Sequence, residues 1–238
     1  MTPTRQDLIA RYRTVSSPTV YDVLDKMRHP NQALSSRIRP LARGHRLAGP
    51  ALTLHGATMS VADGSWGTAF SYDMFRAIQP GDVIVFDCGG HEQGGPWGGN
   101  TGATARVKGA AGIIIDGGTR DETDLIAMGF PTWCRFVTPV LAHGRFQIHG
   151  FNVPITMAGQ LEARVTIAPG DFVVADDDGV VIVPEALVAE VIEFAEAAEQ
   201  AEVAIRRAIE VGEDRESIDR RLDRWALLKA RQATRETP

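Results

Sequence analysis

The sequence has few of the residues that mark several classes of protein. Only two of its 238 residues are cysteines, Cys88 and Cys134, and they do not form a CxxC pair. We therefore expect neither a disulfide framework nor a zinc knuckle, and a reducing compartment fits best. No segment approaches the roughly 18 consecutive apolar residues of a membrane-spanning helix, and the N-terminus has no apolar signal core. These absences predict a cytoplasmic protein without a membrane partner.

An excess of positive charge is also missing. The formal net charge is -5, whereas nucleic-acid-binding domains usually carry a basic face or stripe. Arginines do gather over 215–224, but acidic residues alternate with them, as on a solvated helix face. We therefore expect no nucleic-acid partner. Hydrophobic residues make up 44% of the chain, which is enough for one sizeable core.

Alternating strand and helix patterns predict an α/β fold. Apolar residues three and four apart predict helices over 5–28, interrupted where Ser17 caps a second helix with Pro18 in its first turn. A glycine- and serine-rich loop is expected at 59–68. Further expected helices are 68–78, 101–109, 121–128, 185–211 and 215–231, and expected strands are 45–58, 83–87, 111–115, 138–142, 153–157, 172–176 and 180–183. We expect one domain over 1–212 and a helical C-terminal extension over 213–238.

Two glycine-rich segments, Gly94–Thr101 and Asp116–Asp121, each follow a buried strand and precede a helix. Ligands of open α/β sheets bind at such strand ends. The first segment would expose backbone N–H groups at a helix start, which suits a carboxylate or a phosphate. It matches neither the P-loop nor the dinucleotide-binding pattern. The alternative is a flexible surface loop.

The second segment ends in Arg120 and Asp121. A guanidinium group can bind a substrate carboxylate through two parallel hydrogen bonds. An aspartate offers a hard oxygen ligand to Mg²⁺ or Mn²⁺, and Mg²⁺ commonly binds one or two protein carboxylates and keeps several waters. From the residues alone, a simple surface ion pair is an equal alternative.

Three stretches together resemble one known family. They are Ser17–Asp25, the segment from Trp97 through Lys108 to Asp121, and Pro169–Asp171 followed by Ala175–Pro184. In this order, over roughly 15–212, they are similar to the RraA-like family of 4-hydroxy-4-methyl-2-oxoglutarate aldolase and the regulator of ribonuclease activity A. The resemblance implies a swivelling β/β/α-type single domain. It also implies a homotrimer or homohexamer with the active site between subunits.

The resemblance also implies roles for individual residues. Arg120 would bind the pyruvyl carboxylate, and Asp121 would hold the divalent metal, so these two are the expected catalytic residues. Backbone amides would complete the substrate cradle at Gly98, Gly99, Asn100 and Thr101. A glutamate of a neighbouring subunit would approach the site, and the candidates are Glu196, Glu199 and Glu202.

One position departs from the pattern. The aldolases usually carry an acidic residue where this chain has Gly99, followed by Asn100. That change puts the chemistry in doubt, or it signals a different 2-oxo acid substrate with Glu92 or His91 compensating. A lone histidine or glutamate in such a loop is otherwise simply exposed.

The expected function is that of a divalent-metal-dependent lyase. Retro-aldol cleavage of a 4-hydroxy-2-oxo acid, decarboxylation of oxaloacetate, or both would proceed through a pyruvate enolate. A Schiff base is not expected, because Lys26, Lys108 and Lys229 lie outside the motif turns. One alternative is a non-catalytic protein-binding regulator that resembles the ribonuclease E inhibitor branch. Another is a sugar-acid or other lyase that rejects short substrates.

Overall fold

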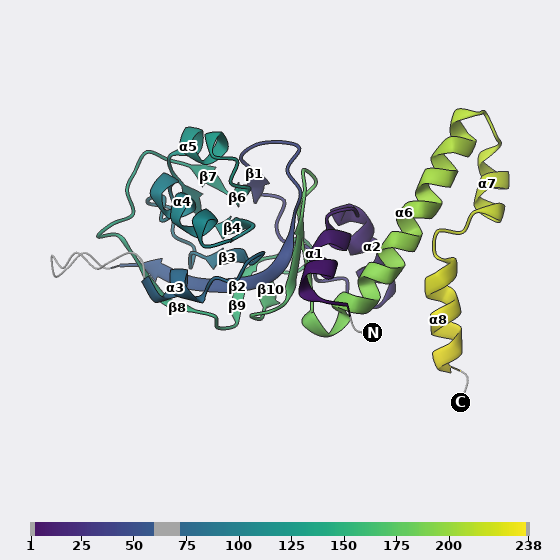
Figure 1. Cartoon of the computed structure of the whole chain (residues 1–238), viewed down its shortest axis with the longest axis horizontal. Coiled ribbons are helices and arrows are strands. Elements are labelled where there is room, and N and C mark those ends of the chain that lie inside the picture. Colours follow the sequence, from purple (N-terminus) through teal and green to yellow (C-terminus); the bar gives the residue numbers. More distant parts are fainter. Residues whose placement is uncertain (1–2, 60–71, 237–238) are drawn as a thin grey trace.

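The computed structural model describes residues 3–59 and 72–236. It has two parts, a body built around a curved sheet and a helical arm that extends away from it (Figure 1). The expected loop at 59–68 and the first residues of the helix expected at 68–78 lie largely outside the described residues. The described part of that helix is α3, Tyr72–Ala77.

Parallel strands form the centre of the body. The sheet order is β1-β6-β4-β3-β2-β11-β12, with β8 also paired to β2. Strands β2, β3, β4 and β6 run parallel to one another, and the other pairings are antiparallel. The strand bounds are β1 Arg39–Pro40, β2 Leu47–Thr58, β3 Val83–Asp87, β4 Gly112–Asp116, β6 Thr132–Cys134, β8 Phe146–Phe151, β11 Phe172–Ala175 and β12 Val180–Val183.

Two short ribbons complete the body. Strands β9, Ile155–Ala158, and β10, Arg164–Ile167, form an antiparallel hairpin. Strands β5, Gly118–Thr119, and β7, Phe136–Val137, form a parallel pair. The mixed α/β architecture agrees with the expected fold class, and its similarity to solved structures is given below.

Strand β3 separates two of the hydrophobic cores because neighbouring side chains along a strand point to opposite faces. Ile84 and Phe86 of β3 face one core, which contains the fully buried Trp97. Val83 and Val85 face the other core, which includes residues of β9 and β10. The first core underlies α3, α4 and α5, and it therefore fixes the helix starts that follow β3 and β5. The bounds of these helices are α4 Gly99–Val107 and α5 Glu122–Ala127.

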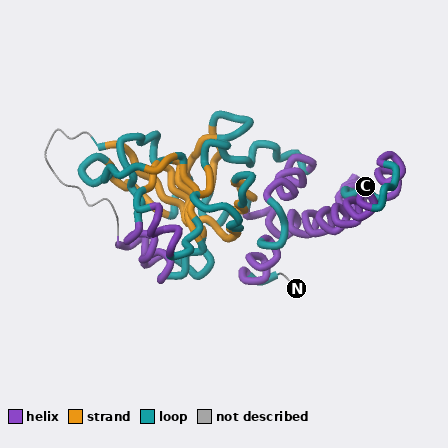
Figure 2. Tube along the Cα trace, turned by 90° about the horizontal axis from the view of Figure 1, so that it is seen from above, coloured by secondary structure: helices purple, strands orange, loops and turns teal. Residues whose placement is uncertain are grey.

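Within residues 3–59 and 72–236, the arm is built of helices joined by loops (Figure 2). They are α1 Arg5–Tyr12, α2 Ser17–Lys26, α6 Val188–Glu210, α7 Arg215–Arg221 and α8 Ala226–Glu236, with a 3-10 turn at Glu185–Leu187 before α6. Helix α6 packs against α1, α2, α7 and α8. None of these helices, or of any others among residues 3–59 and 72–236, is long and apolar enough to cross a membrane.

Several local predictions need correction. The N-cap of α2 is Ser16 rather than Ser17, because the Ser17 hydroxyl and amide both donate to the Asp176 carboxylate, at 2.6 and 2.7 Å. The single helix expected at 215–231 is two helices, separated at Leu222, whose backbone leaves the helical region (φ -114°, ψ 87°). The strand expected at 138–142 is irregular and contributes one bridge, between Gly95 and Leu141.

Candidate active site

A pocket of about 560 Å³ lies where the β3–α4 loop meets the junction of β5 and α5. Its size is typical of sites for small molecules. Five of the six predicted site residues line it, and Gly99 does not. The five are Gly98, Asn100, Thr101, Arg120 and Asp121. The structure therefore brings together two motifs that are about twenty residues apart in the sequence.

Backbone hydrogen bonds hold the two motifs in register. Thr119 pairs with Trp97 as in a parallel sheet. The Arg120 amide donates to the Trp97 carbonyl at 2.9 Å, and the Thr119 hydroxyl donates to the same oxygen at 3.1 Å. Since Trp97 and Thr119 are both fully buried, Arg120 and Asp121 project from a rigid base.

Asp121 adopts the left-handed conformation, with φ 56° and ψ 41°. Aspartate is one of the few residues other than glycine that visit this region, and such strain gathers at functional sites. The carboxylate lies at the start of α4, where Oδ2 accepts a hydrogen bond from the Gly99 amide at 3.0 Å. Oδ1 accepts from Arg120 Nε at 3.2 Å. The Asp121 side chain remains 35% exposed, so a ligand can reach it.

Helix α4 begins without a side-chain cap of its own, because its N-cap is Gly98. A Cβ atom at Gly98 would lie 2.7 Å from Asp121 Oδ2 and 2.9 Å from Arg120 Cγ. A side chain at position 98 would therefore displace Asp121 or Arg120 from its place. The next amides, of Asn100 and Thr101, have no acceptor within the helix, and the positive end of the helix dipole favours an anion there.

A side chain at position 99 would also meet close neighbours, which are acidic residues. A Cβ atom at Gly99 would lie 3.3 Å from Asp124 Oδ2 and 3.4 Å from Asp121 Cβ. Asp124 belongs to the first turn of α5. A second carboxylate therefore lies near Asp121, outside the residues that line the pocket. The sequence analysis missed it, because its closeness to the Gly99 backbone arises only in the fold.

The two residues considered as compensation for Gly99 lie outside the pocket lining. Glu92 is largely exposed and pairs with Arg135 at 3.3 Å. The His91 ring is buried, and its Nδ1 shares a hydrogen bond with the Thr58 hydroxyl at 2.9 Å. Burial lowers the pKa of His91 because it disfavours the charged imidazolium.

A second wall of the pocket was not predicted at all. It consists of Tyr72 and Phe75 from α3 and of Leu141, Ala142 and His143 from the segment before β8. No local motif marks these residues. Leu141, Ala142 and His143 reach the pocket because the segment at 140–142 contacts the β3–α4 loop, where the Gly95 amide donates to the Val140 carbonyl at 3.0 Å.

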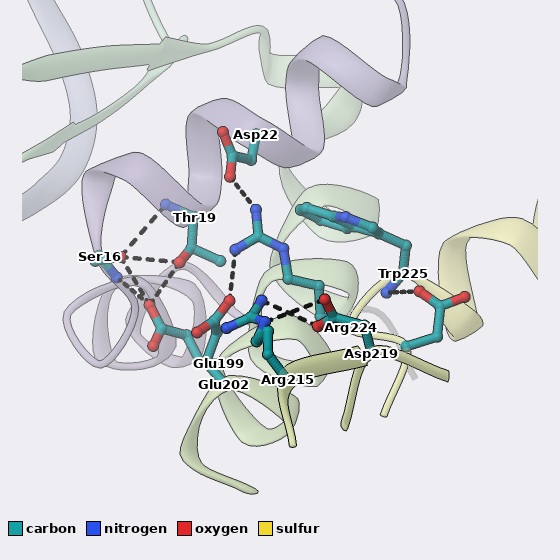
Figure 3. A network of polar contacts seen from close by, with 10 residues as sticks. Ser16, Thr19, Asp22, Glu199, Glu202, Arg215, Asp219, Arg224 and Trp225 are labelled. Carbon is teal, nitrogen blue, oxygen red and sulfur yellow. Dashed lines mark hydrogen bonds and ion pairs between the residues drawn. The ribbon is translucent and has the colours of Figure 1, made fainter. Parts of the chain in front are cut away.

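The three candidate glutamates all have partners within their own chain. Glu196 accepts two hydrogen bonds from Arg11, at 2.8 and 2.6 Å. Glu199 accepts from the N-terminus of α2, and Glu202 accepts from Arg224 at 2.6 Å (Figure 3). These contacts join α6 to the other parts of the arm: Glu196 to α1, Glu199 to α2, and Glu202 to the segment between α7 and α8.

The pocket fits a weakly held, water-rich cation better than a fully enclosed one. In the described part of the chain no three histidine, cysteine or acidic side chains are grouped so that they could hold a metal ion. Asp121 offers a half-exposed carboxylate, with Asp124 close by. Oxygen ligands of this kind suit Mg²⁺ or Mn²⁺ with several bound waters, whereas a structural zinc site needs four protein ligands.

Comparison with known proteins adds independent information. The family model described as "RraA-like: Aldolase/RraA" matches residues 17–182. A curated relative from Halalkalibacterium halodurans, named "Putative 4-hydroxy-4-methyl-2-oxoglutarate aldolase", is 34% identical over 203 residues, which cover 85% of this chain and 89% of the relative.

Solved structures share the architecture. An uncharacterized protein from Pseudomonas syringae aligns with a TM-score of 0.76 and 28% identity, over 92% of this chain and 99% of that chain. Streptomyces coelicolor RraAS2, described as an unusual member of the RNase ES inhibitor RraA protein family, aligns with a TM-score of 0.73 and 31% identity. That alignment covers 87% of this chain and 98% of that chain.

Proposed function

This chain belongs to the RraA-like family, and on that premise we propose that it is a divalent-metal-dependent lyase of 2-oxo acids. The reaction is retro-aldol cleavage of a 4-hydroxy-2-oxo acid, decarboxylation of oxaloacetate, or both. Each produces a pyruvate enolate. The observation that carries the proposal is the meeting of Arg120 and Asp121 at the uncapped start of α4, inside one pocket.

The carboxylate end of the substrate has a complementary surface in this pocket. The Arg120 guanidinium is 30% exposed and lines the pocket beside the Asn100 and Thr101 backbone. An arginine fork binds a carboxylate through two parallel bonds. The free amides of α4 supply further donors and a favourable dipole. These groups also lower the energy of an oxyanion that develops next to the carboxylate.

The metal would be held by Asp121, with Asp124 as a second carboxylate that acts through bound water. A bound Mg²⁺ or Mn²⁺ supplies Lewis-acid stabilisation of the enolate oxygen. The hydrogen bond from the Gly99 amide keeps the Asp121 carboxylate pointed at the pocket. Arg120 offsets part of its negative charge, which leaves the pair suited to a substrate with a carboxylate and a neighbouring carbonyl.

Assembly into a homotrimer or homohexamer with the site between subunits is part of the same proposal. The pocket is open enough for a neighbouring chain to complete it, since Tyr72 on its wall is 73% exposed. Light scattering coupled to gel filtration measures the mass directly. A monomer with full activity would contradict this part of the proposal.

Pyruvate release tests the enzymatic proposal. Oxaloacetate and 4-hydroxy-4-methyl-2-oxoglutarate are supplied with Mg²⁺ or Mn²⁺, and EDTA should abolish turnover.

Asp121→Asn should lower kcat/KM by at least about 100-fold, since it removes the charge that anchors the cation. Arg120→Lys should raise KM about 10-fold, because lysine keeps the charge but loses the fork. Glu122→Gln, at the neighbouring exposed carboxylate, is the matched control.

The alternative is a non-catalytic regulator that binds a protein partner. It is favoured by the likeness to RraAS2, a member of a ribonuclease-inhibitor family. Metal-independent background rates, unchanged by Asp121→Asn, would support it and contradict the lyase. A lyase for longer sugar acids predicts a third pattern, with turnover of extended 4-hydroxy-2-oxo acids and none of the two short substrates.

A further inference from the structure

The wall of the pocket around His143 has no part in the chemistry described above. Among the described residues that line the pocket, His143 is the one histidine. Its side chain is partly buried, and it lies between Ala142, which is buried, and the chain turn that leads into β8. The position therefore combines access to the pocket with a fixed backbone.

Backbone hydrogen bonds fix this wall on both sides of His143. Before it, Gly95 pairs with Leu141, and its amide donates to Val140. After it, the amides of Arg145 and Phe146 both donate to the Ala142 carbonyl, at 2.8 and 3.0 Å, and close a turn around His143.

The same short loop holds His143 and Arg120. The loop at 94–97 bonds to the 140–141 segment through Gly95 and to Arg120 through the Trp97 carbonyl. Gly94 contributes close packing as well, since a Cβ atom there would lie 3.1 Å from Ala142 Cα. The imidazole and the guanidinium are therefore supported by one rigid backbone unit, which is what a reaction with two positioned groups requires.

The length of the substrate indicates which part of it this wall would contact. With its carboxylate and carbonyl at Arg120 and Asp121, the rest of a 4-hydroxy-2-oxo acid must extend into the remaining pocket. Apart from those two residues, the titratable side chains that line the described pocket are Tyr72 and His143. Histidine is the side-chain type that exchanges protons near neutral pH, whereas an ordinary tyrosine does so near pH 10.

We propose that His143 is the catalytic residue that accepts the proton of the 4-hydroxyl group during retro-aldol cleavage. This rests on the proposed lyase function. The imidazole takes the hydroxyl proton, the C4–O bond becomes a carbonyl, and the C3–C4 bond breaks. The electron pair of that bond forms the pyruvate enolate. The imidazolium then returns the proton to C3, which becomes the methyl group of pyruvate.

The two lyase reactions depend on this residue differently. Decarboxylation of oxaloacetate releases CO₂ from an ionised C4 carboxylate, so no hydroxyl proton needs to be removed, and water can protonate the enolate at C3 after the carbon–carbon bond has broken. His143→Gln should therefore lower kcat for 4-hydroxy-4-methyl-2-oxoglutarate by about 100-fold or more, the usual contribution of a general base. The KM for that substrate and the kcat for oxaloacetate should stay within about 3-fold of the wild-type values.

Exchange of the methyl protons of pyruvate for deuterium gives a second readout. In D₂O the wild-type enzyme with Mg²⁺ should exchange them, and His143→Gln should slow the exchange, as followed by proton NMR. His149→Gln, at an exposed histidine on β8 outside the pocket lining, is the control and should behave as wild type. Thermal unfolding followed by circular dichroism confirms that both variants fold.

Three results would overturn the inference. An equal fall in kcat for both substrates in His143→Gln would indicate a binding or structural role. An unchanged kcat for both would show that His143 takes no part in catalysis. A wild-type enzyme that decarboxylates oxaloacetate but cleaves no 4-hydroxy acid would also refute it, while leaving the lyase proposal intact. Release of pyruvate from neither substrate would instead be a failure of the proposed function itself.

Discussion

Three helices of the arm, α1, α2 and α7, begin differently from the two helices α4 and α5 beside the pocket. In the arm, Thr4, Ser16 and Asp214 each cap their own helix by accepting a hydrogen bond from an amide of the first turn. Beside the pocket, α4 and α5 begin at Gly98 and Asp121, and neither residue caps its own helix. Instead, Asp121 accepts a hydrogen bond from the first amide of α4.

This difference separates groups that stabilise the fold from groups that serve the site. A side-chain cap contributes roughly 1 kcal/mol to stability. A helix start without one leaves donors free for a ligand. At the start of α4, the Asp121 carboxylate accepts the hydrogen bond of the Gly99 amide. The amides of Asn100 and Thr101 remain available to a ligand. The predictions below separate the two kinds of helix start by measuring stability and activity in the same variants.

Gly98→Ala should have the largest effect, and the effect should fall on activity. The added methyl group would lie 2.7 Å from Asp121 Oδ2, so the carboxylate must move. A displacement of about 1 Å in an active site can cost about 100-fold in rate, which is the fall in kcat/KM expected here. Gly179→Ala, where a Cβ atom meets nothing within 4 Å, is the control. Similar kinetics in both variants would contradict the tight contact at Gly98.

Asp124→Asn should weaken metal binding without abolishing it. Loss of a carboxylate that acts through water commonly lowers metal affinity by about 10-fold. Isothermal titration with Mn²⁺ measures the Kd directly, independently of turnover. Glu122→Gln removes a charge from the same helix start and should leave the Kd unchanged. An Asp124→Asn variant with wild-type affinity would exclude Asp124 from the metal's surroundings.

Glu199→Gln should lower the free energy of unfolding by about 1 kcal/mol and leave kcat unchanged. Glu199 accepts hydrogen bonds from the Ser16 amide, the Ser16 hydroxyl and the Thr19 hydroxyl, at 2.8–3.0 Å. Bonds to a charged acceptor are strong, but solvent screens this partly exposed group. Urea titrations at pH 7 provide the measurement. A large loss of activity at unchanged stability would place Glu199 in catalysis instead.

The same variant has a pH signature. Burial would raise the pKa of Glu199, but hydrogen bonds from Ser16 and Thr19, together with Arg206, hold it below the ordinary value of 4.5. The folded state therefore binds this proton less readily than the unfolded state. Its contribution is present above about pH 4.5 and is lost as pH falls through the lower folded-state pKa. The stability of Glu199→Gln should fall less steeply over that acidic range.

Thr4→Ala should have the smallest effect, about 0.5 kcal/mol of stability and none on turnover. The Thr4 hydroxyl accepts from the Asp7 amide at 3.2 Å at the start of α1, far from the pocket lining. Thr4→Ser keeps the oxygen and should restore stability. If Thr4→Ala altered kcat/KM, the division between stabilising and functional helix starts would not hold.

Local patterns predicted much of the body. Apolar runs identified β3, β4, β11 and β12, because strands buried on both faces read as continuous hydrophobic segments. Strand β8 has the sequence FQIHGF and was missed, since its glycine and polar residues weaken the alternation. Its place is set by pairing with the distant β2, which no short window of sequence records.

The candidate site shows the same contrast between residues in continuous motifs and residues placed by contacts across the fold. Arg120, Asp121 and the Gly98–Thr101 segment could be proposed from the sequence, because each motif follows a predicted strand and the family resemblance assigns roles to these residues, and those roles stay predictions. Asp124 and His143 were not proposed, since Asp124 lies beside the Gly99 backbone and the segment before His143 pairs with Gly95, in each case across the fold. The left-handed backbone of Asp121, which turns its carboxylate toward α4, likewise has no signature in the sequence.

Helix α6 has a consequence for the order in which the protein folds during synthesis. Its residues Glu196 and Glu199 hold Arg11 and Ser16, partners 185 and 183 positions earlier in the chain. A ribosome adding about 5–20 residues per second needs roughly 10–40 s to span that gap. Helices α1 and α2 are therefore made long before α6, and until then α1 can be held only by earlier parts of the body, such as strand β2 and Asp82, which pairs with Arg5.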